Sequence, residues 1–385
     1  MKKKYRLHQQ MAKFLLILFG LLFSTIISAK PTVVTDILGR KVTVNTPIKK
    51  VILGEGRMLY LVAMLDKDNP AKRIVAIGND MQTSDPATWR QYSTYFPQLN
   101  RIPTFGGTEK RSLNIEKALA LQPDAIIMNI EAKTAIEEQG YDKALEKAGI
   151  PIVYIDFRYN PLKNTTPTMR LFGTLWGKEE IAEKFIEFRD KQLKRVSDVL
   201  SNQHPKKPRI FIERIGGYTD ECCLTFGNGN FGRFVSLAGG ENIGEKNAPN
   251  TFYMMDPEQV IAANPDKVVV TSANFSSFMP NGDWIGLGPN ENMEAAKAKL
   301  KKYLKKPAYT GSNAVKNQQF YAIWHQFYNS PYDFIAIQQL ARWFHPELFP
   351  DLNADETFKA LYDKFLPISY KPGYFVSLGD KKPSW

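Results

Sequence analysis

Cys222 and Cys223 are adjacent, and they are the only cysteines in the chain. A tetrahedral zinc site needs four ligands, so two thiolates would need two more from histidine or carboxylate side chains. Of the four histidines, only His325 directly follows a predicted strand. An oxidising compartment favours a disulfide, yet neighbouring Cα atoms lie about 3.8 Å apart, closer than ordinary disulfides allow. A strained vicinal disulfide and two buried thiols therefore both remain open.

A glycine-rich loop follows the cysteines. Gly227, Gly229 and Gly232 spell G-x-G-x-x-G ahead of the helical stretch FGRFVSLAGG. Such a loop could aim backbone N–H groups at a phosphate, but a single match of this pattern is weak. The order of strand, loop and helix with an acidic residue at the end of the next strand is not evident here. We interpret the loop as a structural turn or the lip of a ligand site, with no bound cofactor.

Three arginines follow the ends of predicted strands. Arg57 comes after the apolar run VIL, Arg158 after IVYID and Arg214 after RIFIE. Ligands of parallel α/β sheets bind beyond the carboxyl ends of the strands, so three guanidinium groups placed there can bind one shared anion. For each arginine alone, a surface salt bridge is the simpler explanation. The same loops supply the other candidate ligand-binding residues: Tyr159, Tyr218, Cys222, Cys223, Trp284, Trp324, His325 and Tyr328.

Strands that alternate with helical segments must position these loops. This alternation predicts an α/β protein whose mostly parallel sheets are flanked by helices. Helical spacing over residues 166–204 predicts one long linking helix between an N-terminal lobe, residues 30–165, and a C-terminal lobe, residues 205–385. The apolar runs lie at 51–54, 73–78, 124–129 and 150–156 in the first lobe, and at 209–214, 266–272 and 319–324 in the second.

An internal repeat supports two lobes of similar construction. LNIEKALALQPDAIIM, residues 113–128, aligns without a gap with MDPEQVIAANPDKVVV, residues 255–270. Glu116 and Glu258 occupy the same place in the two copies. A helix start favours an acidic residue, because the helix dipole is positive there, but that preference alone does not require Glu at both positions.

The N-terminus predicts export. Four basic residues among the first six and Lys13 precede an apolar run over 14–27, and the segment ends in Ser28-Ala29. This pattern is typical of a secretory signal peptide over residues 1–29, with cleavage after Ala29, although an uncleaved anchor is the alternative. Its removal lowers the formal charge from +12 to +7, since it carries five positive charges and no negative ones. No cysteine follows to accept a lipid, so we expect a periplasmic protein that is not a lipoprotein. No segment rich in Lys and Arg is interleaved with aromatic residues, so we do not expect it to bind nucleic acid.

The order of motifs resembles a known family, the periplasmic substrate-binding proteins of iron-siderophore and cobalamin ABC importers. The resemblance covers nearly all of the chain after residue 29. Each motif is weak by itself, but their order is specific. The motifs are DILGRKVTV (36–44), SLNIEKALALQPDAII (112–127), AGIPIV (148–153), AGGENI (238–243) and NSPYDFIAIQQLARWFHPELFPDL (329–352).

The resemblance implies a fold and a set of partners. Members have two Rossmann-like lobes joined by one rigid helix, with the ligand in a shallow cleft between them. Each lobe carries a glutamate that docks on arginines of the inner-membrane permease dimer, which works with ATPase subunits. Glu116 and Glu258 stand at those positions. We therefore expect a monomeric binding protein without catalytic residues, cofactor or metal of its own.

The ligand that we expect is a ferric siderophore of the catecholate or carboxylate type. Such a complex is anionic and flat-sided, so guanidinium groups and aromatic rings suit it. Haem, with His325 or a cleft tyrosine as axial ligand, and cobalamin are alternatives within the family. A periplasmic enzyme that pairs a cysteine with His325 is a further alternative, but no set of nucleophile, base and oxyanion donors is recognisable. Capture of a bare metal ion would need more histidines.

Overall fold

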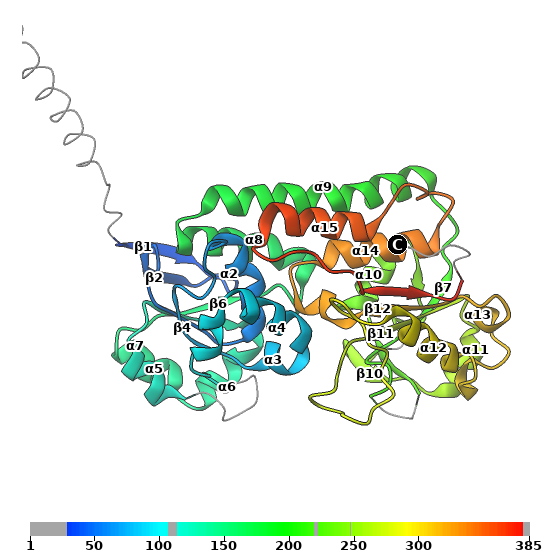
Figure 1. Ribbon diagram of the computed structural model, residues 1–385, viewed down its shortest axis with the longest axis horizontal. Helices are drawn as coiled ribbons and strands as arrows, with labels where there is room; N and C mark the ends of the chain where they lie inside the picture. The colour runs from blue at the N-terminus through cyan, green and yellow to red at the C-terminus, as the bar shows by residue number, and fades with distance from the viewer. Residues whose placement is uncertain (1–28, 107–113, 219–221, 247, 380–385) are drawn as a thin grey trace, which may run out of the picture.

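The computed structural model describes residues 29–106, 114–218, 222–246 and 248–379, which form two α/β lobes (Figure 1). Helix α9 (Glu179–Gln203) runs along one side of the molecule and joins the lobes. The predicted fold class is confirmed. Most of the predicted signal peptide, residues 1–28, lies outside the described residues. Within the described part of the chain, no helix combines the length and apolar character needed to cross a bilayer.

The N-terminal lobe is built on a four-stranded parallel sheet with the order β4-β3-β5-β6. Its strands are short, almost fully buried apolar runs, as expected for a parallel sheet that is covered on both faces. The strands are β3 (Val51–Leu53), β4 (Ile74–Ile77), β5 (Ala125–Asn129) and β6 (Ile152–Ile155), preceded by an antiparallel hairpin of β1 (Lys30–Thr35) and β2 (Lys41–Thr46). The helices are α2 (Leu59–Leu65), α3 (Asp80–Ser84), α4 (Pro86–Tyr95), α5 (Ile115–Leu121), α6 (Lys133–Glu138), α7 (Tyr141–Lys147) and α8 (Pro161–Trp176).

The C-terminal lobe has a mixed sheet with the order β10-β8-β7-β11-β12-β13, and β9 also pairs with β7. Its central strands β7, β11 and β12 are parallel, and antiparallel strands extend both edges. The strands are β7 (Arg209–Glu213), β8 (Leu224–Phe226), β9 (Glu241–Asn242), β10 (Phe252–Met254), β11 (Lys267–Ser272), β12 (Phe320–Trp324) and β13 (Phe375–Ser377). The helices are α10 (Phe231–Leu237), α11 (Pro257–Ala263), α12 (Met293–Tyr303), α13 (Asn313–Lys316), α14 (Asp333–Phe344) and α15 (Ala354–Phe365).

The predicted linking helix over 166–204 is two helices, so its boundary is corrected. Helix α8 ends at Trp176, and Gly177 adopts φ +64°, a left-handed conformation that ends a helix and favours glycine. Helix α8 packs against α9 and against the hairpin strand β2 of the N-terminal lobe. Helix α9 alone connects the lobes.

The lobes also share a buried interface. The rings of Tyr60 in α2 and Tyr332 in the C-terminal lobe lie 5.4 Å apart, and the Tyr60 hydroxyl donates to the carboxylate of Asp85. Across the same boundary, the side chain of Gln326 donates to the carbonyl of Ser84 at 2.6 Å. Helix α15 lies beside α9 and extends toward the N-terminal lobe (Figure 1). The linking helix is therefore not the only restraint on lobe movement.

The sequence repeat corresponds to two matching helices, α5 and α11. Each has seven residues and ends in a left-handed residue, Gln122 or Asn264. Each begins after a side chain that caps the helix N-terminus, Asn114 or Asp256. The second residue of each helix is exposed, and these residues are Glu116 and Glu258.

The aspartate after each helix has the same role in both lobes. The carboxylate of Asp124 accepts from the backbone N–H of Lys50, and the carboxylate of Asp266 accepts from that of Arg209. Each contact ties the turn after the helix to the start of a neighbouring parallel strand. This local need explains the repeated Pro-Asp pair without reference to function.

Candidate ligand-binding site

Arg57 lies at the end of β3, in the 3-10 helix Gly56–Met58, and is almost completely buried. Its Nε lies 2.7 Å from Oδ2 of Asp80, and its Nη1 donates to Oδ1 of Asn329 in the other lobe at 2.7 Å. Burial lowers the pKa of Arg57, but the carboxylates of Glu55 and Asp80 outweigh this effect and raise it above the usual value. The guanidinium group is thus charged and fixed at the boundary between the lobes.

Arg158 follows β6 in the same lobe. Its Nη1 lies 2.5 Å from Oε2 of Glu131 and 3.6 Å from Oε1 of Glu55. Its backbone N–H donates to the buried carboxylate of Asp156, which organises the loop. Its carbonyl accepts from the side-chain amide of Asn230 in the C-terminal lobe at 3.2 Å. Both the side chain and the backbone of Arg158 are therefore held in place.

Arg214 follows β7 in the C-terminal lobe and is held differently. Its backbone N–H donates to the carbonyl of Leu224, and its guanidinium carbon lies 4.6 Å from the centre of the Phe252 ring. Its Nε is buried and has no hydrogen-bond partner. Among the described residues, no carboxylate lies within salt-bridge distance of this guanidinium group. A buried donor without a partner is costly, and a ligand that accepts from it would relieve that cost.

The charges of all three arginines act on His325 and Tyr328, which lie just after β12, and the guanidinium carbon of Arg158 lies 6.0 Å from the centre of the Tyr328 ring. Burial lowers the pKa of His325, and Arg214, Arg158 and Arg57 lower it further, so the ring is neutral at ordinary pH. Burial raises the pKa of the Tyr328 phenol, but the same three arginines outweigh burial and lower it. Nδ1 of His325 lies 2.9 Å from Oγ1 of Thr271. Charges from both lobes therefore act on one small region.

Glu55 belongs to this cluster, although the sequence reasoning passed over it. Its side chain is 1% exposed, and neither carboxylate oxygen has a hydrogen-bond partner. It lies 3.6 Å from Nε of Arg57 and 3.6 Å from Nη1 of Arg158. Burial raises its pKa more than the two arginines lower it. Its position directly after β3, two residues before Arg57, was the signal that could have identified it. Glu131, just after β5, could have been identified in the same way.

The remaining aromatic candidates have different environments. Tyr159 and Tyr218 are 56% and 49% exposed, so their rings are free to contact a ligand. Trp284 is half-buried; its indole N–H donates to the carbonyl of Met279, and the ammonium of Lys299 lies over its ring. Trp324 is 1% exposed and packs edge-on against Phe327 and Tyr374, so it lies in the core, and its predicted contact with ligand stays a prediction. It lies on a strand with all five residues buried.

The glycine loop is structural in its tightest position. A Cβ on Gly232 would overlap the carbonyl oxygen of Gly227, so a larger residue cannot replace it. The loop also borders a pocket of about 650 Å³ between the lobes. This pocket is lined by residues that include Tyr159, Asn160, Gly229 and Arg233. A turn that forms one lip of an inter-lobe pocket matches the interpretation made from the sequence.

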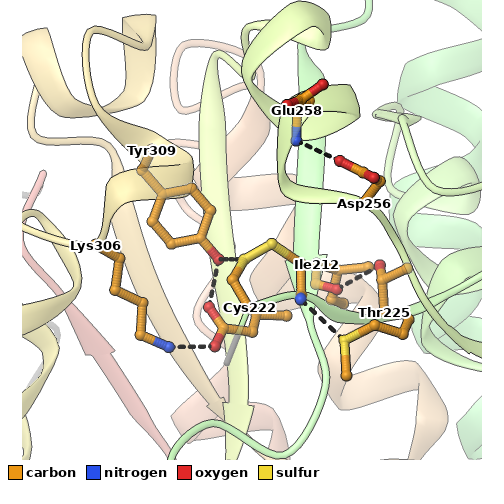
Figure 2. The surroundings of a disulfide bond; sticks show 10 residues. Ile212, Cys222, Thr225, Asp256, Glu258, Lys306 and Tyr309 are labelled. Carbon is orange, nitrogen blue, oxygen red and sulfur yellow. Dashed lines mark hydrogen bonds and ion pairs between the residues drawn. A yellow bond between two sulfur atoms is a disulfide. The ribbon is translucent and has the colours of Figure 1, made fainter. Parts of the chain in front are cut away.

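Cys222 and Cys223 form a vicinal disulfide (Figure 2). Of the two states left open by the sequence, the structure has the oxidised one. Sγ of Cys222 lies 4.0 Å from the hydroxyl of Tyr309, and that hydroxyl donates to the buried carboxylate of Glu213. Lys306 also donates to Glu213, at 2.6 Å. No described contact connects the disulfide with the three arginines.

The disulfide instead borders a pocket beside α11. This pocket has a volume of about 650 Å³ and is lined by Cys222, Met254, Met255, Asp256, Pro257, Lys306, Pro307 and Ala308. Asp256 caps α11, and Figure 2 shows Glu258 at the same end of that helix. Cys222 thus lies near a predicted docking glutamate, and Cys223 is fully buried, while the predicted contact of both cysteines with ligand stays a prediction.

No group of three or more His, Cys, Asp or Glu residues is arranged to hold a metal ion in the part of the chain that the structure describes. The candidate site is thus a cluster of three arginines at the ends of parallel strands, with a buried carboxyl, a histidine and a tyrosine between them. Its donors are suited to binding an anion from two sides.

Residues 80–326 match the family described as periplasmic binding protein. The chain belongs to this family. Together with a structural neighbour of 28% identity, this match places the chain among the class III periplasmic binding proteins of ABC importers. The resemblance inferred from the order of motifs is confirmed.

Two of three similar proteins are described with different ligands. A TroA-like periplasmic binding protein, FepB from Veillonella parvula, has a TM-score of 0.82 and 28% identity, and the match covers 90% of this chain and 99% of that one. The molybdate-binding protein MolA from Haemophilus influenzae is 24% identical over 88% of this chain and 92% of the relative. CeuE from Helicobacter pylori, in a nickel-histidine complex, has a TM-score of 0.62 and 17% identity, covering 88% of this chain and 97% of that one.

Proposed function

We propose that this binding protein captures an anionic ferric siderophore, of the catecholate or carboxylate type, between its lobes. It delivers this complex to an inner-membrane ABC permease dimer with ATPase subunits. The observation that carries the proposal is that the charges of Arg57, Arg158 and Arg214, from three strand ends in two lobes, all lower the pKa of His325 and Tyr328. The guanidinium carbon of Arg158 lies 6.0 Å from the centre of the Tyr328 ring.

Charge and shape both support this ligand class. Arg214 offers a buried donor that lacks a partner, and hydrogen bonds from a guanidinium group to an anion are among the strongest in proteins. Tyr159 and Tyr218 add exposed rings that can pack against flat aromatic chelating groups. A ligand larger than a simple ion would reach both the arginines and these rings. The resemblance to the binding proteins of iron-siderophore importers points to the same class.

A small oxyanion is the second candidate, because the curated relative is a molybdate-binding protein that matches along most of both chains. Molybdate would use the same arginines and would leave Tyr159 and Tyr218 without contact. The two candidates therefore share the charge recognition and differ in the size of the ligand. Substitution of the exposed tyrosines separates them.

The test is a binding panel measured by isothermal titration calorimetry on the purified protein without residues 1–29. The probes are a hexadentate ferric catecholate, a neutral ferric hydroxamate, haem, cobalamin and molybdate. We expect the ferric catecholate to bind most tightly and Tyr159→Ala to weaken it. Preference for molybdate, unaffected by Tyr159→Ala, would favour the second candidate. Preference for the neutral hydroxamate or for cobalamin would contradict the anionic ligand.

A further inference from the structure

The carboxyl group of Glu55 lies inside the arginine cluster without a hydrogen bond. Each of its oxygens is buried and lacks a hydrogen bond, and each forms only a long ion pair, at 3.6 Å, with Arg57 or Arg158. Those guanidinium groups direct their closer contacts to other carboxylates, Arg57 to Asp80 and Arg158 to Glu131. A buried polar group in this state needs an explanation, because the lost solvation is not replaced. A carboxyl that has only these long ion pairs could form a hydrogen bond with a ligand that reaches the arginines.

The charged groups around Glu55 are balanced. Arg57 and Arg158 favour its ionised form, while Asp80 and Glu131 and the burial itself favour the neutral form. Together these effects raise the pKa of Glu55 from its ordinary value, with burial as the largest cause. A further negative charge placed nearby would raise that pKa again.

An anion bound by Arg57 and Arg158 comes close to Glu55, because both guanidinium groups are within 3.6 Å of its oxygens. Two negative charges this close repel strongly where water is largely excluded. A proton held between the two acids removes this repulsion, as it does for paired carboxylates in other sites. The neutral carboxyl then becomes an O–H donor that points at the anion.

We propose that Glu55 is a ligand-binding residue that takes up one proton as the anion binds and donates it in a hydrogen bond to the ligand. The O–H bond forms on the Glu55 carboxylate with a proton from solvent, and no bond of the ligand breaks. This inference rests on the proposed function, because it requires an anionic ligand. It makes affinity depend on pH through one identified side chain.

The direction in which affinity depends on pH follows from the pKa of Glu55 in the free protein and in the complex. The pKa of Glu55 is higher in the complex than in the free protein, so binding is strongest below the free-state pKa. Between the two pKa values affinity decreases by up to about tenfold for each unit of pH. Above the pKa of the complex the contribution is lost.

The experiment counts protons. The ferric catecholate and molybdate are each titrated into wild-type protein at several pH values, in two buffers of different ionisation enthalpy. We expect uptake of close to one proton and weaker binding as pH increases. Glu55→Gln carries a neutral donor permanently, so it should show no proton uptake and should bind about tenfold more tightly than wild type at the highest pH.

Glu131→Gln is the matched control, because Glu131 also contacts Arg158 but is 32% exposed and already hydrogen-bonded. Proton uptake should persist in this variant. Binding without proton uptake in the wild type, or uptake that persists in Glu55→Gln, would overturn this inference alone. The wild-type proton count needs no variant, so the inference is testable even if Glu55→Gln does not fold. Failure of both anions to bind would overturn the anionic proposed function together with it.

Discussion

The two lobes hold their arginines in different ways. In the N-terminal lobe, Arg57 and Arg158 are braced by carboxylates at 2.7 and 2.5 Å. In the C-terminal lobe, Arg214 rests over the ring of Phe252, and among the described residues it has no carboxylate partner. These ion pairs fix the positions of the two guanidinium groups and partly neutralise their charge. The N-terminal lobe therefore supplies arginines in fixed positions. The C-terminal lobe supplies the positive charge that is least compensated.

The same lobes are alike where they are predicted to contact the permease. Helices α5 and α11 share their length, capping pattern and exposed glutamate at the second position. Symmetry is thus kept at the helices that carry Glu116 and Glu258 and lost at the ligand cluster. This difference is expected if a twofold permease dimer meets both lobes while one asymmetric ligand lies between them.

The largest expected effect tests the symmetric helices. Reversal of both predicted docking charges, Glu116→Lys with Glu258→Lys, should reduce ligand uptake by cells to background, because the lysines would repel the permease arginines that the family resemblance implies. Affinity for ligand in the isolated protein should not change. Glu294→Lys is the matched control, since Glu294 is also the exposed second residue of a capped helix, α12, but lies outside the repeat. Retained uptake in the double variant would show that docking does not depend on this pair.

A smaller expected effect, on stability, tests the different contacts of the arginines in the two lobes. Arg57→Ala leaves the buried carboxylate of Asp80 with backbone N–H donors but without its charged partner, so we expect a loss of about 3–5 kcal/mol in the free energy of unfolding. Arg214→Ala leaves no described carboxylate without a partner and removes one contact with the Phe252 ring. It should therefore lower the free energy of unfolding by only about 1 kcal/mol. Urea denaturation of both variants measures the difference. Equal losses would contradict the contrast between the lobes.

The smallest expected effect concerns lobe movement. The lobes share α9, the Tyr60–Tyr332 contact and the bond from Asn230 to the carbonyl of Arg158, so binding should cause little closure. Small-angle scattering with and without ferric catecholate should give the same radius of gyration within error. A clear decrease would mean that these contacts break when ligand binds.

Much of the fold could be predicted because it depends on local patterns. Apolar runs predicted the parallel strands, and the repeat predicted two equivalent helices. The break in the linking helix was missed, because Gly177 ends α8 through a backbone conformation that hydrophobic spacing does not reveal. The helical pattern continues on both sides of this short turn.

The candidate site was harder to predict than the fold. Arg57, Arg158 and Arg214 could be chosen because strand ends are positions where ligands bind. Glu55 could not be chosen in this way, because only the structure shows that its buried carboxyl has no hydrogen bond. Trp324 and the cysteines also follow or end strands, but packing directs Trp324 into the core and Cys222 toward α11. Strand position selects a loop, whereas tertiary packing determines where each side chain points.

The most direct test of the account is the affinity of Arg214→Ala for an anionic ligand. Loss of one charged hydrogen bond of about 1.5–3 kcal/mol should weaken binding of the ferric catecholate by about ten- to a hundredfold. Binding of a neutral ferric hydroxamate should not change, and Arg170→Ala should have no effect, because Arg170 forms an exposed pair with Glu183. Wild-type affinity of Arg214→Ala for the anionic complex would contradict recognition by the arginine cluster.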